Sequence, residues 1–249
     1  MTVGFAGRAR MGAWTPVWIE VTAPSGGVDG TVTIEAAASI GAPVVRYAAP
    51  LRAAAGARVK VFVPAIFYDA RAPGIVYLDD ARGRLGALAL PRLKAVDDLV
   101  VALSSEPVGV ESASISGERP EIAYVAPEDL PPVWQAYEAV RLLVVRTLDE
   151  RRVDDAQRMA VQHWVWSGGR LLAMPAGDDV RHLRGGTLSA LLPGMVSPAR
   201  LRPEAALVTI NPRPDSEVVV EDGVKIVRRR LGWGRVTLWN RDGADLAWR

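Results

Sequence analysis

The chain has 249 residues, 49% of them hydrophobic and 23% charged, a balance that excludes a largely disordered protein. It contains no cysteine, which excludes disulfides, thiolate metal sites and a cysteine nucleophile. Its 30 basic and 28 acidic side chains leave a net charge of only +2, which argues against a nucleic-acid-binding surface.

Residues 1–92 show the alternation of apolar and polar side chains that is typical of half-buried strands. The clearest cases are residues 31–36 and 58–63, where every second side chain is apolar. Further strand candidates are residues 17–21, 44–47 and 75–78. Turn residues separate these stretches, and Asp79 and Asp80 are assigned to such a turn. The spacing predicts an immunoglobulin-like β-sandwich domain.

The pattern changes after Pro91, and residues 93–249 are predicted to form a second domain. Four short stretches are apolar at nearly every position, as expected for strands buried on both faces of a parallel sheet: residues 99–103, 122–125, 142–145 and 170–174. We therefore expect an α/β domain with an open, mostly parallel sheet. Strands are also expected at residues 217–221, 224–230 and 235–239, either at the edge of this sheet or as a separate appendage.

One helix is clearly predicted, from residue 154 to residue 167. Asp154 and Gln157 have the spacing of an N-terminal capping box, and Gly168 and Gly169 end the helix. The side chains at helical spacing on its expected buried face are Ala156, Met159, Ala160, His163 and Trp164. The helix joins two of the predicted parallel strands, so the order is strand, helix, strand.

Several motifs resemble known bacterial families. Residues 12–21, which read Gly-Ala-Trp-Thr-Pro-Val-Trp-Ile-Glu-Val, resemble the opening of β-sandwich domains in bacterial envelope proteins. The strand 140–145, the helix with its His163-Trp164-Val165, and residues 168–172 resemble a class I glutamine-amidotransferase-like (flavodoxin-like) domain. Leu191-Leu192-Pro193 and Gly232-Trp233-Gly234-Arg235-Val236 are also similar to that family. The resemblance covers most of the chain.

The resemblance implies a catalytically incomplete relative. A glutamine amidotransferase needs a cysteine on the turn after one strand, and by the resemblance this turn is residues 174–179. These residues are Met-Pro-Ala-Gly-Asp-Asp, without cysteine, serine or threonine. The sequence therefore predicts that the chain is not a functional glutamine amidotransferase. No catalytic residue, metal ligand or cofactor is assigned.

A ligand-binding site is expected at the carboxyl ends of the parallel strands, because open α/β sheets bind ligands at this edge. The polar and glycine residues that follow these strands are Ser104, Ser105, Glu106, Thr147, Asp149, Gly177, Asp178, Asp179 and His182. The run Arg228-Arg229-Arg230 is not assigned to a binding patch, because successive side chains of a strand point to opposite faces.

The leading hypothesis is a non-enzymatic binding or scaffolding module. By the resemblance it is the extracytoplasmic soluble part of a membrane-anchored bacterial protein, and the alternative location is the cytoplasm. The expected partners are other envelope proteins or the protein's own anchoring segments, and no nucleic acid. No transmembrane segment is predicted within the chain, and its oligomeric state is left open.

Two other functions are kept open. The first is a hydrolase or metal-dependent enzyme in which Asp149, Asp178 and His182 converge at the sheet edge. The second is a periplasmic sugar-binding domain, suggested by the eight tryptophans, which would then be exposed along a groove. Trp134, Trp164 and Trp166 lie in predicted helical stretches, where packing in the core or at a domain interface is expected instead.

Overall fold

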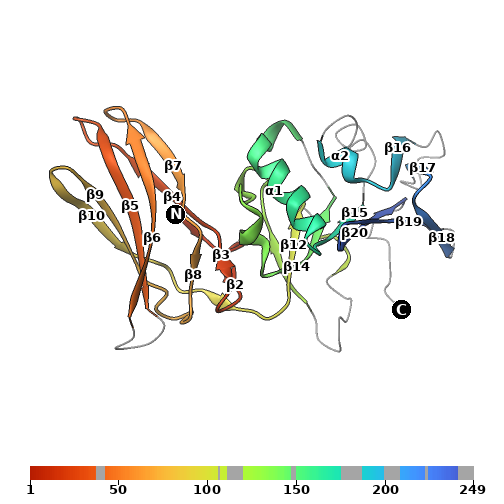
Figure 1. Cartoon of the computed structure of the whole chain (residues 1–249), viewed down its shortest axis with the longest axis horizontal. Helices are drawn as coiled ribbons and strands as arrows, with labels where there is room; N and C mark the ends of the chain where they lie inside the picture. Colours follow the sequence, from red (N-terminus) through yellow and green to blue (C-terminus); the bar gives the residue numbers. More distant parts are fainter. Residues whose placement is uncertain are drawn as a thin grey trace. The chain divides into compact units, whose positions relative to one another are not determined.

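The computed structural model describes residues 1–37, 43–105, 107–110, 120–146, 150–174, 187–198, 208–221 and 224–240 (Figure 1). The chain divides into two compact units. The first comprises Met1–Asp97 together with Ala136–Ala139, and the second comprises Asp98–Gln135 together with Val140–Arg249.

The first unit consists of strands. They are β1 (Thr2–Val3), β2 (Arg8–Ala9), β3 (Trp14–Thr15), β4 (Val17–Thr22), β5 (Val28–Ala37), β6 (Val44–Ala53), β7 (Arg58–Phe62), β8 (Ala65–Ile66), β9 (Ile75–Asp80), β10 (Gly83–Ala89) and β11 (Lys94–Ala95). Two antiparallel sheets, with strand orders β1-β4-β7 and β10-β9-β5-β6, contribute side chains to one apolar core. Val32 and Ile34 of β5 are fully buried in it, which confirms the alternation predicted for residues 31–36.

The predicted turn is present at Ala81 and Arg82, but the acidic pair Asp79–Asp80 ends the strand before it. Both residues pair with β5, opposite Thr31 and Gly30, and β9 therefore continues through them. Each carboxylate binds an arginine of the hairpin: Arg84 Nε lies 3.0 Å from Asp79, and Arg82 Nη2 lies 2.6 Å from Asp80. The hydrogen bond from the Arg82 side chain lowers the pKa of Asp80. These carboxylates are therefore used within the hairpin.

The elements that follow along the chain are mostly strands with short helical turns between them. They are β12 (Leu99–Leu103), β13 (Glu121–Tyr124), η2 (Pro127–Asp129), η3 (Trp134–Tyr137), β14 (Val140–Val145), η4 (Glu150–Arg152), α1 (Asp155–Trp166), β15 (Arg170–Ala173), α2 (Thr187–Leu191), β16 (Gly194–Pro198), β17 (Val208–Pro212), β18 (Glu217–Glu221), β19 (Val224–Leu231) and β20 (Gly234–Trp239).

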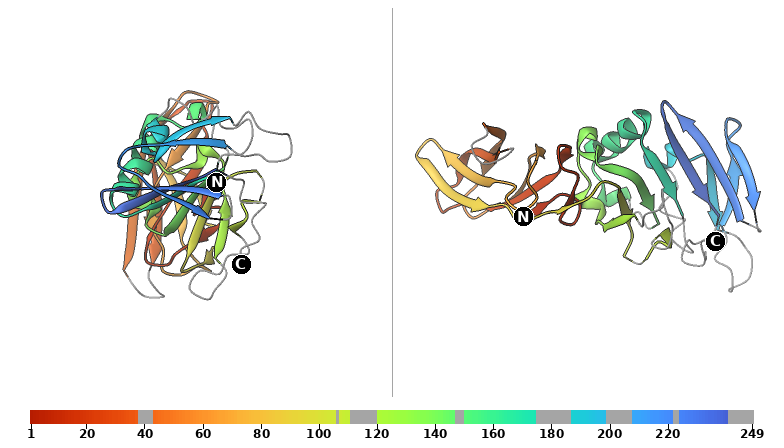
Figure 2. Two further views of the ribbon diagram at one scale, coloured as in Figure 1. Left: turned by 90° about the vertical axis from the view of Figure 1, so that its right-hand side faces the viewer. Right: turned by 90° about the horizontal axis from the view of Figure 1, so that it is seen from below.

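A seven-stranded mixed sheet organises the second unit, in the order β13-β12-β14-β15-β20-β19-β18 (Figures 1 and 2). The strands from β13 to β20 in this order pair in parallel, and β19 and β18 add to the sheet antiparallel. Every residue of β12 is buried, as its apolar run predicts. The C-terminal strands therefore extend the sheet and are not a separate appendage.

The predicted fold class is nevertheless wrong. Of the described residues, 52% are in strands and only 13% in helices, with several small sheets beside the large mixed one. An open α/β domain of amidotransferase type needs helices after most strands to cover both faces of its sheet. Among the described residues the α-helices are α1, with 12 residues, and α2, with 5. The chain is therefore mostly β with one large mixed sheet, and an immunoglobulin-like assignment has no support.

The capping of α1 is confirmed, but its predicted buried face is rotated. Asp154 accepts a hydrogen bond from the backbone of Gln157, whose side chain accepts one from the backbone of Asp154. The buried residues are Gln157, Ala160, Val161, Trp164 and Val165, whereas Ala156, Met159 and His163 are exposed. The Gln157 amide donates to the carbonyls of Glu128 and Leu130, which explains how a polar side chain can face inward.

Candidate functional site

Two of the predicted site residues lie in the described part of the chain. Ser104 and Ser105 follow β12 at the carboxyl edge of the parallel strands, with Ser105 exposed. The remaining predicted residues lie outside the described part of the chain: Glu106, Thr147, Asp149, Gly177, Asp178, Asp179 and His182. The convergence of Asp149, Asp178 and His182 therefore stays a prediction.

The described part of this carboxyl edge is occupied by Arg146, which follows β14 and is nearly buried. Its guanidinium donates a 2.8 Å hydrogen bond to the carbonyl of Pro107. Within the described ranges, no three histidine or acidic side chains are grouped closely enough to hold a metal ion. No helix of these ranges is long and apolar enough to cross a membrane.

A different site lies at the opposite edge of the sheet, where the loop after α1 meets the β19–β20 turn. The two backbones touch directly: the N–H of Trp233 donates to Trp166 O at 2.9 Å, and the N–H of Arg235 donates to Gly169 O at 3.1 Å. A Cβ atom on Gly234 would lie 1.9 Å from Val165 O. Glycine is therefore required there, because only a residue without a side chain lets the two backbones approach so closely.

Three arginines cross the sheet in one row at this edge. Arg170 of β15 pairs with Arg235 of β20, and Arg235 pairs in turn with Arg230 of β19. Residues paired directly across strands have their side chains on the same face, and neighbouring strands lie about 4.8 Å apart. Arg170, Arg235 and Arg230, which we call the arginine row, are all exposed.

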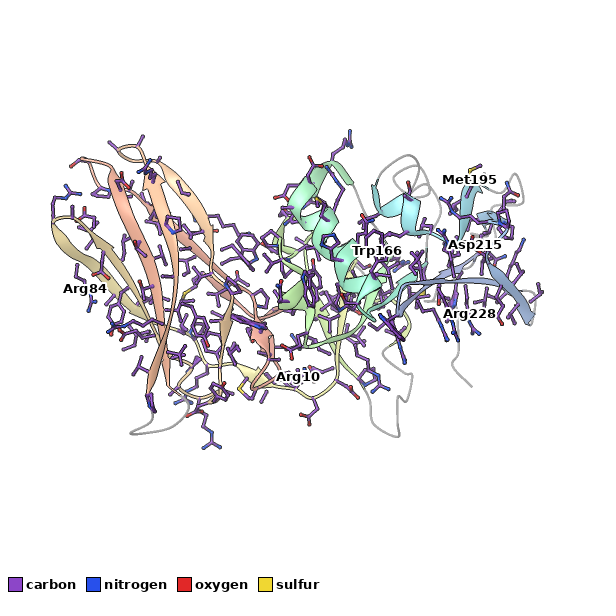
Figure 3. All side chains as sticks on the ribbon, in the orientation of Figure 1. Arg10, Arg84, Trp166, Met195, Asp215 and Arg228 are labelled. Atoms are coloured by element: carbon purple, nitrogen blue, oxygen red, sulfur yellow. The ribbon has the colours of Figure 1, made fainter. Side chains whose placement is uncertain are left out.

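The arginine row has no acidic partner among the residues that the structure describes. The neighbouring arginines of β19 differ from it. Arg229 points to the other face, where its Nε lies 2.7 Å from Asp215. Arg228, two residues before Arg230, is half-buried and directly opposite Glu217 of β18. Figure 3 labels Arg228 and Asp215 on opposite sides of the C-terminal strands. Within the described residues these three positive charges in register repel one another, and a bound anion would relieve the repulsion.

A hollow of about 400 Å³ lies beside the row. Its described lining consists only of glycine, arginine and tryptophan: Gly168, Arg170, Arg230, Gly232, Trp233, Gly234 and Arg235. Trp233, at the tip of the turn, is 91% exposed. Trp166, whose carbonyl accepts the hydrogen bond from the Trp233 N–H, lies at the carboxyl end of α1 (Figure 3) and is 45% exposed. The site thus combines guanidinium donors with accessible indole rings.

The sequence-based prediction missed this site for two reasons. The alternation of side chains along a strand correctly places Arg229 on the opposite face from Arg228 and Arg230. It cannot show that Arg170 and Arg235 lie beside Arg230, because this depends on the pairing of distant strands. Trp164 is packed in the core, whereas Trp166 and Trp134 are 45% and 42% exposed, so core packing is not found for these two. The glycines around Trp233 were the available signal.

Comparison with known proteins adds a partial family match. Residues 1–89 match the model of a family described as a domain of unknown function, DUF8726. This match covers strands β1 to β10 and ends before the second unit, which contains the arginine row. No curated protein matches the sequence.

Several solved structures are similar at low sequence identity. The cytoplasmic protein STM1381 from Salmonella typhimurium LT2 has a TM-score of 0.45 at 11% identity, over 60% of this chain and 89% of that one. The cytoplasmic protein STM3548 from Salmonella typhimurium has a TM-score of 0.44 at 12% identity, over 59% and 88%. The exo-beta-1,4-mannosidase Op5Man5 from Opitutaceae bacterium strain TAV5 has a TM-score of 0.35 at 14% identity, over 58% and 31%. All three TM-scores are below 0.5, so these similarities do not establish a shared function.

Proposed function

We propose that the chain is a non-enzymatic binding module whose arginine row takes up the anionic group of a ligand. The observation that carries this proposal is the set of three in-register guanidinium groups, exposed and without an acidic partner in the described structure. Guanidinium groups present paired N–H donors that match the oxygens of phosphate or carboxylate groups. A bound anion would also relieve the repulsion along the row.

The residues that line the hollow favour binding over catalysis. Arginine keeps its proton at any physiological pH, and glycine and tryptophan side chains supply neither a nucleophile nor a general base. The described lining contains only these three residue types. It can therefore hold and orient an anion, but it has no group that accepts a proton or forms a covalent intermediate.

We further propose that this binding takes place outside the cytoplasmic membrane, as part of a membrane-anchored assembly. The support is the resemblance of residues 12–21 to the opening strand of bacterial envelope domains. Membrane-anchored partners would hold ligand groups at a high local concentration close to the arginine row.

Inorganic pyrophosphate is a suitable first probe, because it carries several phosphate oxygens and no other recognition group. We expect calorimetric titration at low ionic strength to show binding that weakens as salt is added. The Arg230→Gln variant should bind about tenfold more weakly, because it loses a charge-assisted hydrogen bond.

Arg229→Gln is the matched control, since it removes the same charge one residue away on the opposite face. Its affinity for pyrophosphate should stay within about twofold of the unmodified protein, which allows for its long-range charge. Equal losses in the two variants, or no binding by the unmodified protein, would rule out the arginine row as the site.

A further inference from the structure

The two tryptophans beside the arginine row are exposed in an unusual way. Trp233 is at the outermost point of a tight turn, between Gly232 and Gly234, and 91% of its surface is accessible. Trp166 is joined to it through the hydrogen bond from the Trp233 N–H to the Trp166 carbonyl. Both are held on rigid elements, because the backbones of the turn and of the helix end are in direct contact. We call Trp166 and Trp233 the tryptophan tip.

The tip is poorly suited to be the wall of a rigid pocket. A ring that is 91% exposed has almost no protein surface against it, so it encloses little of a small ligand, whereas small-molecule sites bury most of the ligand surface. A fluid lipid layer can surround the ring from all sides and would bury far more of its apolar area. Indole rings favour the boundary between water and lipid, where both their apolar body and their N–H group are accommodated.

The outer face of α1 lies on the other side of the sheet from the arginine row. A Cβ on Gly234 would meet Val165 of α1, so Gly234 faces the helix and its neighbour Arg235 faces away from it. Met159, about two turns before the helix end, is 52% exposed, and His163 is exposed with its ring centroid 5.9 Å from that of Trp166. These side chains lie at positions three and four residues apart, and so on one side of the helix. Of the two tryptophans, Trp233 lines the hollow beside the arginine row, and the outer face of α1 is not part of the docking surface.

We propose that the arginine row and the tryptophan tip together dock on an anionic lipid bilayer. This inference rests on the proposed function and names the source of the anion as the phosphate of a lipid headgroup. The headgroup phosphate would lie in the hollow between the guanidinium groups, and the Trp233 ring would enter the interfacial layer. The charge complementarity is direct, since each basic side chain close to an anionic membrane strengthens binding by about fivefold.

Cosedimentation with vesicles tests this inference. We expect the protein to bind vesicles of phosphatidylglycerol and phosphatidylcholine in equal parts, and not vesicles of phosphatidylcholine alone. Trp233→Ala should weaken vesicle binding by about tenfold, because the buried ring area is lost, while pyrophosphate binding is retained. Trp134→Ala is the matched control, since it removes another exposed tryptophan of the same unit, and it should bind vesicles like the unmodified protein.

The outcomes separate the two proposals. Binding of pyrophosphate without binding of the anionic vesicles would overturn the membrane inference and leave the proposed function standing. Vesicle binding that is unchanged in Trp233→Ala would also overturn it. Binding of a short single-stranded oligonucleotide in place of the vesicles would also overturn the membrane inference, provided that Trp233→Ala weakens the binding of the oligonucleotide. Failure of both pyrophosphate and vesicles to bind would remove both proposals.

Discussion

Replacing Gly234 with alanine is expected to lower the free energy of unfolding by about 3 kcal/mol. The added Cβ would lie 1.9 Å from Val165 O and 2.5 Å from Gly169 O, and both contacts are with backbone atoms that cannot rotate away. The turn and the helix end would have to separate, and the hydrogen bonds that join them would be lost or lengthened. Urea unfolding followed by circular dichroism measures the effect.

The Gly86→Ala variant is the control for this substitution. Gly86 lies in the exposed strand β10, and no atom lies within 4 Å of the position of its Cβ. Alanine at this position should change the free energy of unfolding by no more than about 1 kcal/mol. The change is stabilising if the main effect is to restrict the conformations of the unfolded chain. If Gly234→Ala were as stable as Gly86→Ala, the close contact between the turn and the helix end would not exist.

Replacing Arg235 with glutamate is expected to raise stability and to abolish anion binding at the same time. Arg235 is the middle member of the arginine row, with Arg170 on one side and Arg230 on the other. A carboxylate at this position exchanges two repulsive cross-strand pairs for two attractive ones, which together should stabilise the fold by about 1 kcal/mol. The affinity for pyrophosphate should fall by well over tenfold, since the site loses one of its three guanidinium groups and gains a negative charge that repels the anion.

The Arg229→Glu variant should show the opposite pattern in both measurements. It places a carboxylate near Asp215, which now binds Arg229, so its unfolding midpoint should fall. Its pyrophosphate affinity should stay close to that of the unmodified protein, because the side chain is on the other face. If instead Arg235→Glu unfolded more easily and still bound pyrophosphate, the row would be structural. A gain of stability with a loss of binding is typical of a functional site.

Local strand formation could be predicted well from the sequence. The alternation in residues 31–36 identifies a strand because neighbouring side chains point to opposite faces, and residues 99–103 read as fully buried because nearly every one is apolar. Strand β10 was missed because its sequence, Gly-Arg-Leu-Gly-Ala-Leu-Ala, is exposed throughout and has no buried face. The fold class was wrong because it depends on how many helices cover the sheet, which short apolar runs do not determine.

The candidate site could not be predicted in the same way. The arginine row joins residues 170, 230 and 235, and the pairing of β15 with β20 that aligns them is a long-range feature of the sheet. The rotation of α1, which exposes Met159 and His163, follows from the hydrogen bonds of the buried Gln157 amide with carbonyls outside the helix. The apolar periodicity alone placed the inward face one step away.

The central claim is that Arg170, Arg230 and Arg235 act together on one anion, and NMR of their side chains tests it most directly. The Nε–Hε signals of the three arginines, assigned through single substitutions, would be followed as pyrophosphate is added. We expect all three to shift along one binding curve with a common dissociation constant, while the signal of Arg229 stays in place. Pyrophosphate binding that leaves these three signals unmoved would contradict the account.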